Sequence, residues 1–182
     1  GNVILATSGA VCLSSDIEPG TWLPDKNHRS YVSMANGILD IDEVMAGGDQ
    51  YLTPNSPNWF SMTSLPYEFD PNACCPKFNA FLSHNLEKDV ERIAILQEWA
   101  GYLLLADTTQ QKFLVLESEG ANGKSVYIAA LTAMLGEENV SNVGLENFAD
   151  RFSRTETLGK LLNAAGDCGE LTARSGQFIV GA

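Results

Sequence analysis

The first part of the chain is rich in turn-forming residues and short apolar runs, and over residues 31–35 two sets of side chains alternate with the period of two that favours β-strands. In the stretch RSYVSMANGILDIDEV, residues 29–44, the pair Asn36-Gly37 separates two such runs. This arrangement predicts a β-hairpin with a type I′ turn, because that turn needs a positive φ at both central residues. The prolines between residues 54 and 76 restrict the following strands to short ones. We therefore expect residues 1–76 to form a small β-rich or α+β module.

A helical period replaces this alternation over residues 77–110. Charged residues occupy the opposite side of this predicted helical segment, as on the solvent face of an amphipathic helix. An adjoining apolar stripe, Leu96, Trp99 and Leu103, is expected to pack in the core. The positions at helical spacing are Leu86, Val90, Ile93, Ala94, Gln97 and Gly101, with Glu87, Lys88, Glu91 and Arg92 on the outer face.

The pattern changes again after residue 110. The run KFLVLE, residues 112–117, is short, continuous and apolar, which is typical of a buried parallel strand. It is followed by the loop SEGANGKS, residues 118–125, and by a helical stretch that ends at Gly136. A second apolar run lies within GKLLNAAGDCGE, residues 159–170. This βαβ order predicts that residues 111–182 form the first part of an α/β P-loop NTPase core with a parallel sheet.

The loop between the predicted strand and helix has the composition of a phosphate-binding loop. In the pattern Gly-x-x-x-x-Gly-Lys-Ser/Thr, Gly123 lets the backbone approach phosphate oxygens, and Lys124 reaches the β- and γ-phosphates. Ser125 offers its hydroxyl to Mg²⁺. Ser118 stands where the first glycine of the pattern belongs, which weakens the pattern without disabling it. The predicted ATP-binding residues are Glu119, Gly120, Ala121, Asn122, Gly123, Lys124 and Ser125.

A phosphate site of this kind also needs an acid at the tip of a neighbouring strand. Asp167 directly ends the second apolar run, and Glu170 follows it. Both are candidate catalytic residues: Asp167 would hold Mg²⁺ together with Ser125, and Glu170 would activate water. The expected cofactors are therefore ATP and Mg²⁺.

Composition limits the classes of partner. The chain has 182 residues, 45% of them apolar and 19% charged, as in a soluble globular protein. No apolar run approaches the roughly 20 residues needed to cross a bilayer. The net charge of −12 opposes binding to nucleic acid backbones, so DNA contacts are expected mostly outside this chain. The cysteines form no C-x-x-C pair and the first residues lack a basic leader, which favours a cytoplasmic location. We interpret the chain as a fragment of a longer protein.

The order of motifs resembles the phage and plasmid primase–helicases, whose motor belongs to helicase superfamily three and is shared with poxvirus-type primase/helicase ATPases. The resemblance covers most of the chain from Tyr31 onward. The stretches that carry it are YVSMANGILDID, LTPNSPNWFSMTSLPYEFDPNACCPKFNAFL, ILQEWAGYLLLADTTQQKFLVLESEGANGKS, AMLGEENVSNVGLENFADRF and LGKLLNAAGDCGEL.

This resemblance implies an AAA+-like parallel sheet and an ATP-driven helicase that forms a homo-oligomeric ring on DNA during replication. It implies ATP binding at Gly120, Asn122, Gly123, Lys124 and Ser125, and it gives the catalytic acid position to Asp167. Ser118 and Asp167 depart from the family's usual Gly and Glu, and because the shorter Asp reaches Mg²⁺ less well, the departure affects hydrolysis more than binding. The isolated fragment is not expected to unwind DNA.

Two alternatives stay open at this point. One is a stand-alone P-loop kinase, although nothing in the sequence marks an acceptor site. The other is a degenerate loop in a module used for assembly or partner binding, which Ser118, Asp167 and the acidic charge favour modestly. Whether nucleotide binds at all separates the last alternative from the other two.

Overall fold

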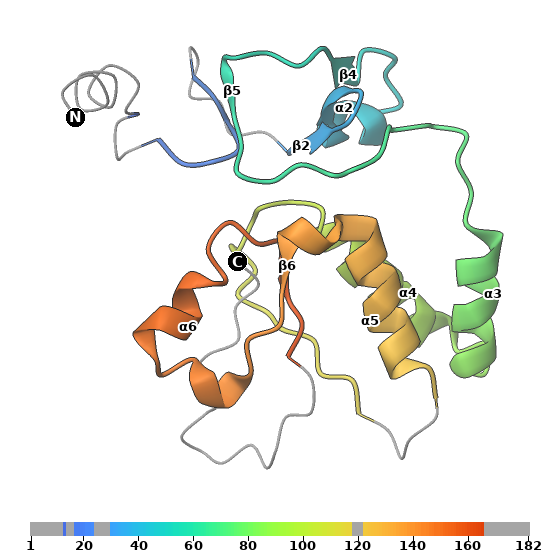
Figure 1. Cartoon of the computed structure of the whole chain (residues 1–182). Coiled ribbons are helices and arrows are strands. Elements are labelled where there is room, and N and C mark those ends of the chain that lie inside the picture. The colour runs from blue at the N-terminus through green and yellow to red at the C-terminus, as the bar shows by residue number, and fades with distance from the viewer. Residues whose placement is uncertain (1–12, 14–16, 24–29, 118–121, 166–182) are drawn as a thin grey trace.

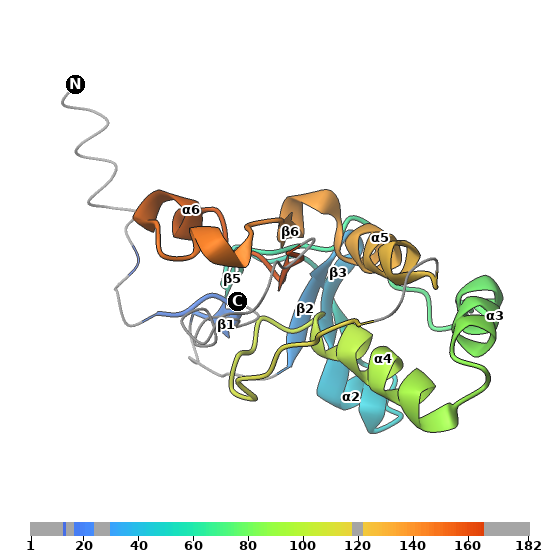
Figure 2. The same cartoon turned by 90° about the horizontal axis from the view of Figure 1, so that it is seen from below.

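The computed structural model describes residue 13 and residues 17–23, 30–117 and 122–165 (Figure 1). Short β-strands of the first part form one layer of the molecule, and the helices α3, α4 and α5 lie in a second layer beneath it. Seen from below, strands β2 and β3 run behind the space between α4 and α5 (Figure 2). Apolar side chains from both layers join in one core.

The three-stranded antiparallel sheet has the order β2–β3–β4. Strand β2 (Tyr31–Met34) pairs with β3 (Gly37–Asp40), and β3 pairs with β4 (Leu52–Thr53). Val32 lies opposite Leu39, so both point toward the core face of the sheet. The hairpin predicted from the alternating pattern is therefore confirmed.

The turn of this hairpin differs from the type I′ turn that was predicted. Its two central residues are Ala35 and Asn36, and neither has a positive φ. The amide of Asn36 donates to Phe69 O (3.1 Å) and accepts from Phe69 N (3.0 Å), which ties the turn to a distant segment. Gly37 has a φ of 149°, and a Cβ there would lie 2.5 Å from Thr53 O. The glycine is thus needed for the close approach of β4 rather than for the turn.

A second antiparallel pair joins β1 (Thr21–Trp22) to β5 (Trp59–Phe60). It brings together three aromatic rings, Trp22, Tyr31 and Trp59, with centroids 5.4–6.0 Å apart. Helix α2 (Ile41–Met45) directly follows β3, and the carboxylate of Asp40 caps it by accepting from Glu43 N. These elements complete the β-rich layer.

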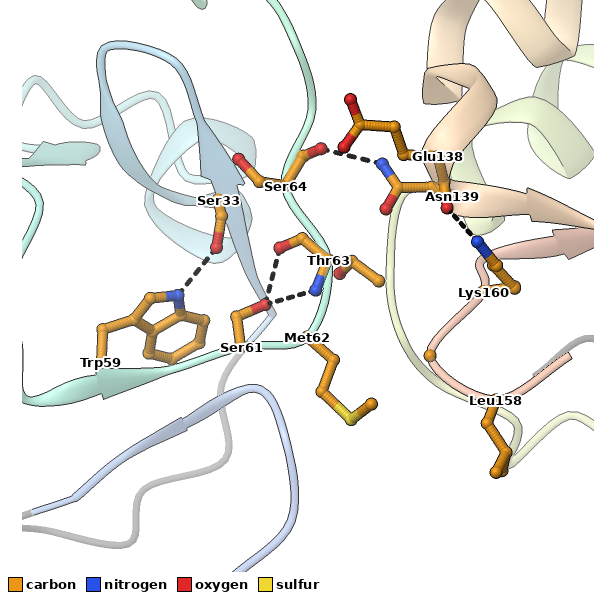
Figure 3. A pocket seen from close by; sticks show the side chains of 11 residues that line it. Ser33, Trp59, Ser61, Met62, Thr63, Ser64, Glu138, Asn139, Leu158 and Lys160 are labelled. Carbon is orange, nitrogen blue, oxygen red and sulfur yellow. Dashed lines mark hydrogen bonds between the residues drawn. The ribbon is translucent and has the colours of Figure 1, made fainter. Parts of the chain in front are cut away.

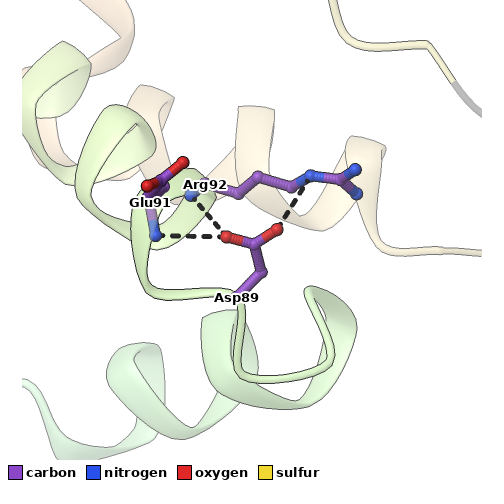
Figure 4. A network of polar contacts seen from close by, with 3 residues as sticks. All are labelled: Asp89, Glu91 and Arg92. Carbon is purple, nitrogen blue, oxygen red and sulfur yellow. Dashed lines mark hydrogen bonds and ion pairs between the residues drawn. The ribbon is translucent and has the colours of Figure 1, made fainter.

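The helical segment consists of two helices, α3 (Pro76–Asn85) and α4 (Val90–Tyr102). Glu87 and Lys88 have positive φ values of 52° and 63°, so the chain leaves the helical conformation at these two residues, which connect α3 to α4. Asp89 starts α4: its carboxylate accepts from the backbone N–H groups of Glu91 and Arg92, and it pairs with the Arg92 guanidinium at 3.2 Å (Figure 4). A good N-cap therefore interrupts the continuous helical spacing expected from Leu86 onward.

Helix α5 (Lys124–Leu135) begins directly after the glycine-rich loop and ends at Gly136, as the sequence predicts. The elements that follow are short: η1 (Glu137–Asn139), β6 (Val140–Ser141), η2 (Leu145–Asn147), α6 (Arg151–Thr155) and β7 (Leu162–Asn163). The carboxylate of Asp150 caps α6, and its hydrogen bonds with the Ser153 backbone N–H and hydroxyl lower the pKa of Asp150.

The predicted α/β P-loop core with an AAA+-like parallel sheet is wrong. Residues 112–117 form no strand: Leu114 and Leu116 pack against the core, while Phe113 and Val115 are exposed. In the described ranges, the only parallel pairing joins β6 to β7, each two residues long. An apolar run can be buried on one side without a hydrogen-bonded neighbour, so it does not specify a sheet. The described chain is a small α+β structure with short antiparallel sheets.

The shared core is centred on α5 and the sheet. Its buried residues come from β2, β3, α3, α4, α5, β6, β7 and the segments that connect them, and Leu135 at the end of α5 is fully buried. No helix in the described part is long and apolar enough to cross a membrane.

Candidate functional site

The start of α5 is shaped by Gly123, which caps the helix in the left-handed region with φ 82° and ψ 7°. A Cβ at this position would lie 2.9 Å from the Phe81 ring and 3.0 Å from Asn85 Oδ1, both on α3. The left-handed backbone conformation therefore favours glycine here, and the side chains of α3 would have to shift to admit a Cβ. This is the second glycine of the predicted phosphate-binding pattern.

Lys124 and Ser125 are the first two residues of the helix. The Lys124 ammonium donates to Asn122 Oδ1 at 3.2 Å, and Ser125 is exposed. Backbone N–H groups of a first helical turn have no acceptor within the helix, and the helix dipole places partial positive charge there. Glycine, lysine and serine thus meet at a helix end whose electrostatics suit an anion.

The packing of α5 holds this end in place. Tyr127, Leu131 and Leu135 form its buried face at helical spacing. The Tyr127 hydroxyl donates to Leu96 O on α4 at 2.7 Å, and its ring stacks on Phe78 of α3. Burial raises the pKa of Tyr127 to about 12. Tyr127 therefore fixes the first turn of α5 against both neighbouring helices.

The structure brings together only part of the predicted site. Asn122, Gly123, Lys124 and Ser125 are adjacent at the start of α5. The other predicted residues lie outside the described residues: Ser118, Glu119, Gly120, Ala121, Asp167 and Glu170. Within residues 13, 17–23, 30–117 and 122–165, no group of three or more His, Cys, Asp or Glu side chains could hold a metal ion. A Mg²⁺ site at Ser125 and Asp167 stays a prediction.

A cleft of about 520 Å³ separates the β-rich layer from the segments around β6 and β7 (Figure 3). Sequence reasoning did not find it, because its walls come from distant parts of the chain. The pair Gly159-Lys160, noted above as part of a motif, lines it. The lining residues are Ser33, Trp59, Ser61, Met62, Thr63, Ser64, Glu138, Asn139, Leu158, Gly159 and Lys160.

Hydrogen bonds fix both walls of this cleft. On one side, Trp59 Nε1 donates to Ser33 Oγ at 2.8 Å. On the other, the Lys160 ammonium donates to the backbone carbonyl of Glu138. Asn139 joins the two sides, since its amide donates to Ser64 O and to Leu135 O, each at 2.8 Å. The cleft is therefore held in a defined shape by groups on three different segments.

The fold and the start of α5 define an α+β protein with a glycine–lysine–serine turn at a helix N-terminus. No model of a known protein family matches the chain, and no curated protein was found to be similar to it in sequence. The resemblance to primase–helicases therefore stays a prediction.

Proposed function

We propose that the chain binds the phosphates of ATP at the start of α5 and is part of a DNA primase–helicase of the phage and plasmid type. The observation that carries the proposal is Gly123, held in a left-handed conformation immediately before a 12-residue helix that begins with Lys124 and Ser125. A helix of that length has a full N-terminal dipole, and glycine opens the backbone toward a ligand.

Each residue of this turn has a distinct task in the proposal. The first-turn N–H groups of α5 would donate to phosphate oxygens, and the Lys124 ammonium would exchange its Asn122 partner for a phosphate. The Ser125 hydroxyl is exposed and could reach a Mg²⁺ ion bound with the nucleotide. ATP would supply the energy for movement along DNA, while the residues of this chain bind and orient its phosphates.

DNA and a homo-oligomeric ring belong to the proposal only through a longer protein. The chain carries 23 acidic against 11 basic residues, so it repels a phosphate backbone rather than attracting one. An intracellular, cytoplasmic site of action fits both the replication role and the free thiols of Cys74 and Cys75.

The test is calorimetric titration of Mg-ATPγS and Mg-ADP into the chain and into Lys124→Ala. Hydrogen bonds to charged groups contribute about 1.5–3 kcal/mol, so we expect Lys124→Ala to weaken binding roughly 10- to 150-fold. Lys77→Ala is the matched control, because Lys77 is exposed on α3 and should leave affinity unchanged. Equal affinity of Lys124→Ala and the unmodified chain would contradict the proposal. Absence of binding to the unmodified chain would favour the assembly module instead.

A further inference from the structure

We propose that the cleft between the β-rich layer and the β6–β7 segments binds a nucleoside monophosphate, with its base against Trp59, its sugar toward Glu138 and its phosphate at Lys160. This site is separate from the phosphate site at the start of α5. Glu138 and Asn139 follow the C-terminal end of that helix, and 12 helical residues span about 18 Å. One mononucleotide cannot occupy both ends.

The aromatic wall of the cleft is rigid. Trp59 packs against Trp22 and Tyr31, with ring centroids 5.4 Å away in each case. Its indole N–H is already bonded to Ser33 Oγ, so the ring can offer the cleft only its apolar surface. A ring fixed in this way loses little conformational freedom when a flat partner stacks on it. A nucleobase meets that requirement.

The opposite wall carries one cation and one anion. The Lys160 ammonium has three N–H donors, and among the described residues only the Glu138 carbonyl accepts from it. The Glu138 carboxylate is exposed and has no hydrogen-bond or ion-pair partner within the described ranges. Figure 3 shows both residues across the cleft from Trp59 and Ser61. An ammonium suits a phosphate, and a carboxylate suits the hydroxyls of a sugar.

Hydroxyl groups of residues 61–64 also line the cleft, on the chain segment that follows Trp59. Ser61 Oγ is occupied, since it donates to Thr63 O and accepts from Thr63 N. The hydroxyls of Thr63 and Ser64 have no hydrogen-bond partner in the described part of the chain and line the cleft. They add donors and acceptors for the polar edge of a ligand, as expected of a small-molecule site.

Gly159 lies in the cleft wall directly before Lys160. Gly159 has a φ of 68°, and a Cβ there would lie 2.8 Å from the Met62 methyl group. The left-handed φ favours glycine at this position, whereas the Met62 methyl group ends a flexible, exposed side chain that can move away from a Cβ. The volume of about 520 Å³ falls within the range of roughly 300–1,000 Å³ that is usual for small-ligand sites.

The same chemistry is present in a free nucleotide and in one unit of single-stranded DNA. The net charge of −12 favours the free nucleotide, because a polyanion would be repelled by the rest of the surface. A short single-stranded oligonucleotide is therefore a separate arm of the experiment, and we expect it to bind more weakly than the monophosphate.

The experiment is titration of AMP and dCMP into the whole chain, followed by calorimetry and by NMR shifts of the indole N–H signals. Adenosine, ribose 5-phosphate and inorganic phosphate are titrated in parallel. We expect the monophosphates to bind with dissociation constants below about 1 mM, more tightly than any of the three fragments. Lys160→Ala should weaken the binding of the monophosphates at least about tenfold, so that their affinity equals that of adenosine. Lys160→Arg should retain the affinity of the unmodified chain.

Two controls accompany the cleft variants. Lys77→Ala should bind the monophosphates as the unmodified chain does, because Lys77 is exposed on α3 outside both sites, and thermal unfolding checks that Lys160→Ala still folds. If Lys160→Ala does not fold, Glu138→Gln replaces it, and the loss should then fall on ligands with a sugar. Absence of monophosphate binding, or unchanged affinity in the folded cleft variants, would overturn the proposal.

Discussion

The antiparallel sheet β2–β3–β4 and the parallel pair β6–β7 differ in what holds their strands together. Strands β2 and β3 are neighbours in the chain and exchange backbone hydrogen bonds along four residue pairs. Strands β6 and β7 share two residue pairs, and Val140 lies opposite the distant Leu162. The parallel pair therefore needs help from side chains that the hairpin does not need.

Asn163 provides that help. Its side-chain oxygen accepts from Ser141 Oγ at 2.9 Å and from Val143 N at 2.8 Å, and its Nδ2 donates to Val143 O at 3.0 Å. One amide thus extends the two-residue ladder along the β6 side. The comparison teaches that local pairing is specified by neighbouring residues, whereas the distant pairing here combines backbone bonds from Leu161 N to Asn139 O and from Ala164 N to Ser141 O with the side chain of Asn163.

The largest expected effect tests whether the β2–β3–β4 sheet and helix α5, which precedes β6, fold as one unit. Leu135 is fully buried and shares a core with Leu39 of the sheet. We expect Leu135→Ala to lower the free energy of unfolding by about 2–5 kcal/mol in a single transition. Val126→Ala, an exposed residue of the same helix, should change it by less than about 0.5 kcal/mol. Denaturant unfolding measures both. Hairpin amides that stay protected from hydrogen exchange after α5 unfolds would show two independent units.

A smaller effect compares two glycines, Gly37 in the β2–β3–β4 sheet and Gly123 at the start of α5. In Gly37→Ala the new Cβ meets the backbone oxygen of Thr53, which cannot move without breaking the β3–β4 pairing. We expect a loss of about 3 kcal/mol in the free energy of unfolding. In Gly123→Ala the new Cβ meets side chains of α3, which can shift. We therefore expect a loss of about 1–2 kcal/mol in the free energy of unfolding, chiefly from the left-handed φ.

The control for both glycines is Gly101→Ala, because a Cβ on that helical residue would meet nothing within 4 Å. It should raise the free energy of unfolding by about 0.5–1 kcal/mol. If Gly123→Ala lowered the free energy of unfolding more than Gly37→Ala, α3 would be the more rigid neighbour, and the expected order of the two effects would be wrong.

The smallest effect concerns pH. Tyr127 has a pKa of about 12 in the fold against about 10 in an unfolded chain, so the fold favours its protonated form. The contribution of this pKa shift to the free energy of unfolding is complete below about pH 10 and is lost as the pH rises from about 10 to about 12. Tyr127→Phe should cost about 1 kcal/mol at pH 7, through the lost bond to Leu96 O, and should lessen the alkaline decline. Part of the decline should persist, because burial also raises the pKa of Tyr67. Unfolding curves at pH 7, 10 and 11 test this, and an unchanged decline would contradict it.

The candidate site was predictable only where its residues are consecutive. Gly123, Lys124 and Ser125 are neighbours in sequence, and the helix that follows them is specified by its own composition between Gly123 and Gly136. The cleft was not predictable, because Trp59 and Lys160 are brought together by packing between layers. Gly159 gave the one local signal, and the structure shows it in a left-handed conformation directly before Lys160.

Local chemistry in the sequence determined the β2–β3 hairpin, the start and end of α5, and the glycine–lysine–serine turn. Each depends on residues within a few positions of one another, so propensity, alternation and capping are sufficient. Tertiary structure alone decided that residues 112–117 form no strand, that β6 pairs with β7 and that a cleft opens beside Trp59. These outcomes depend on which distant segment supplies the neighbouring hydrogen bonds and side chains, and an apolar run does not encode that choice.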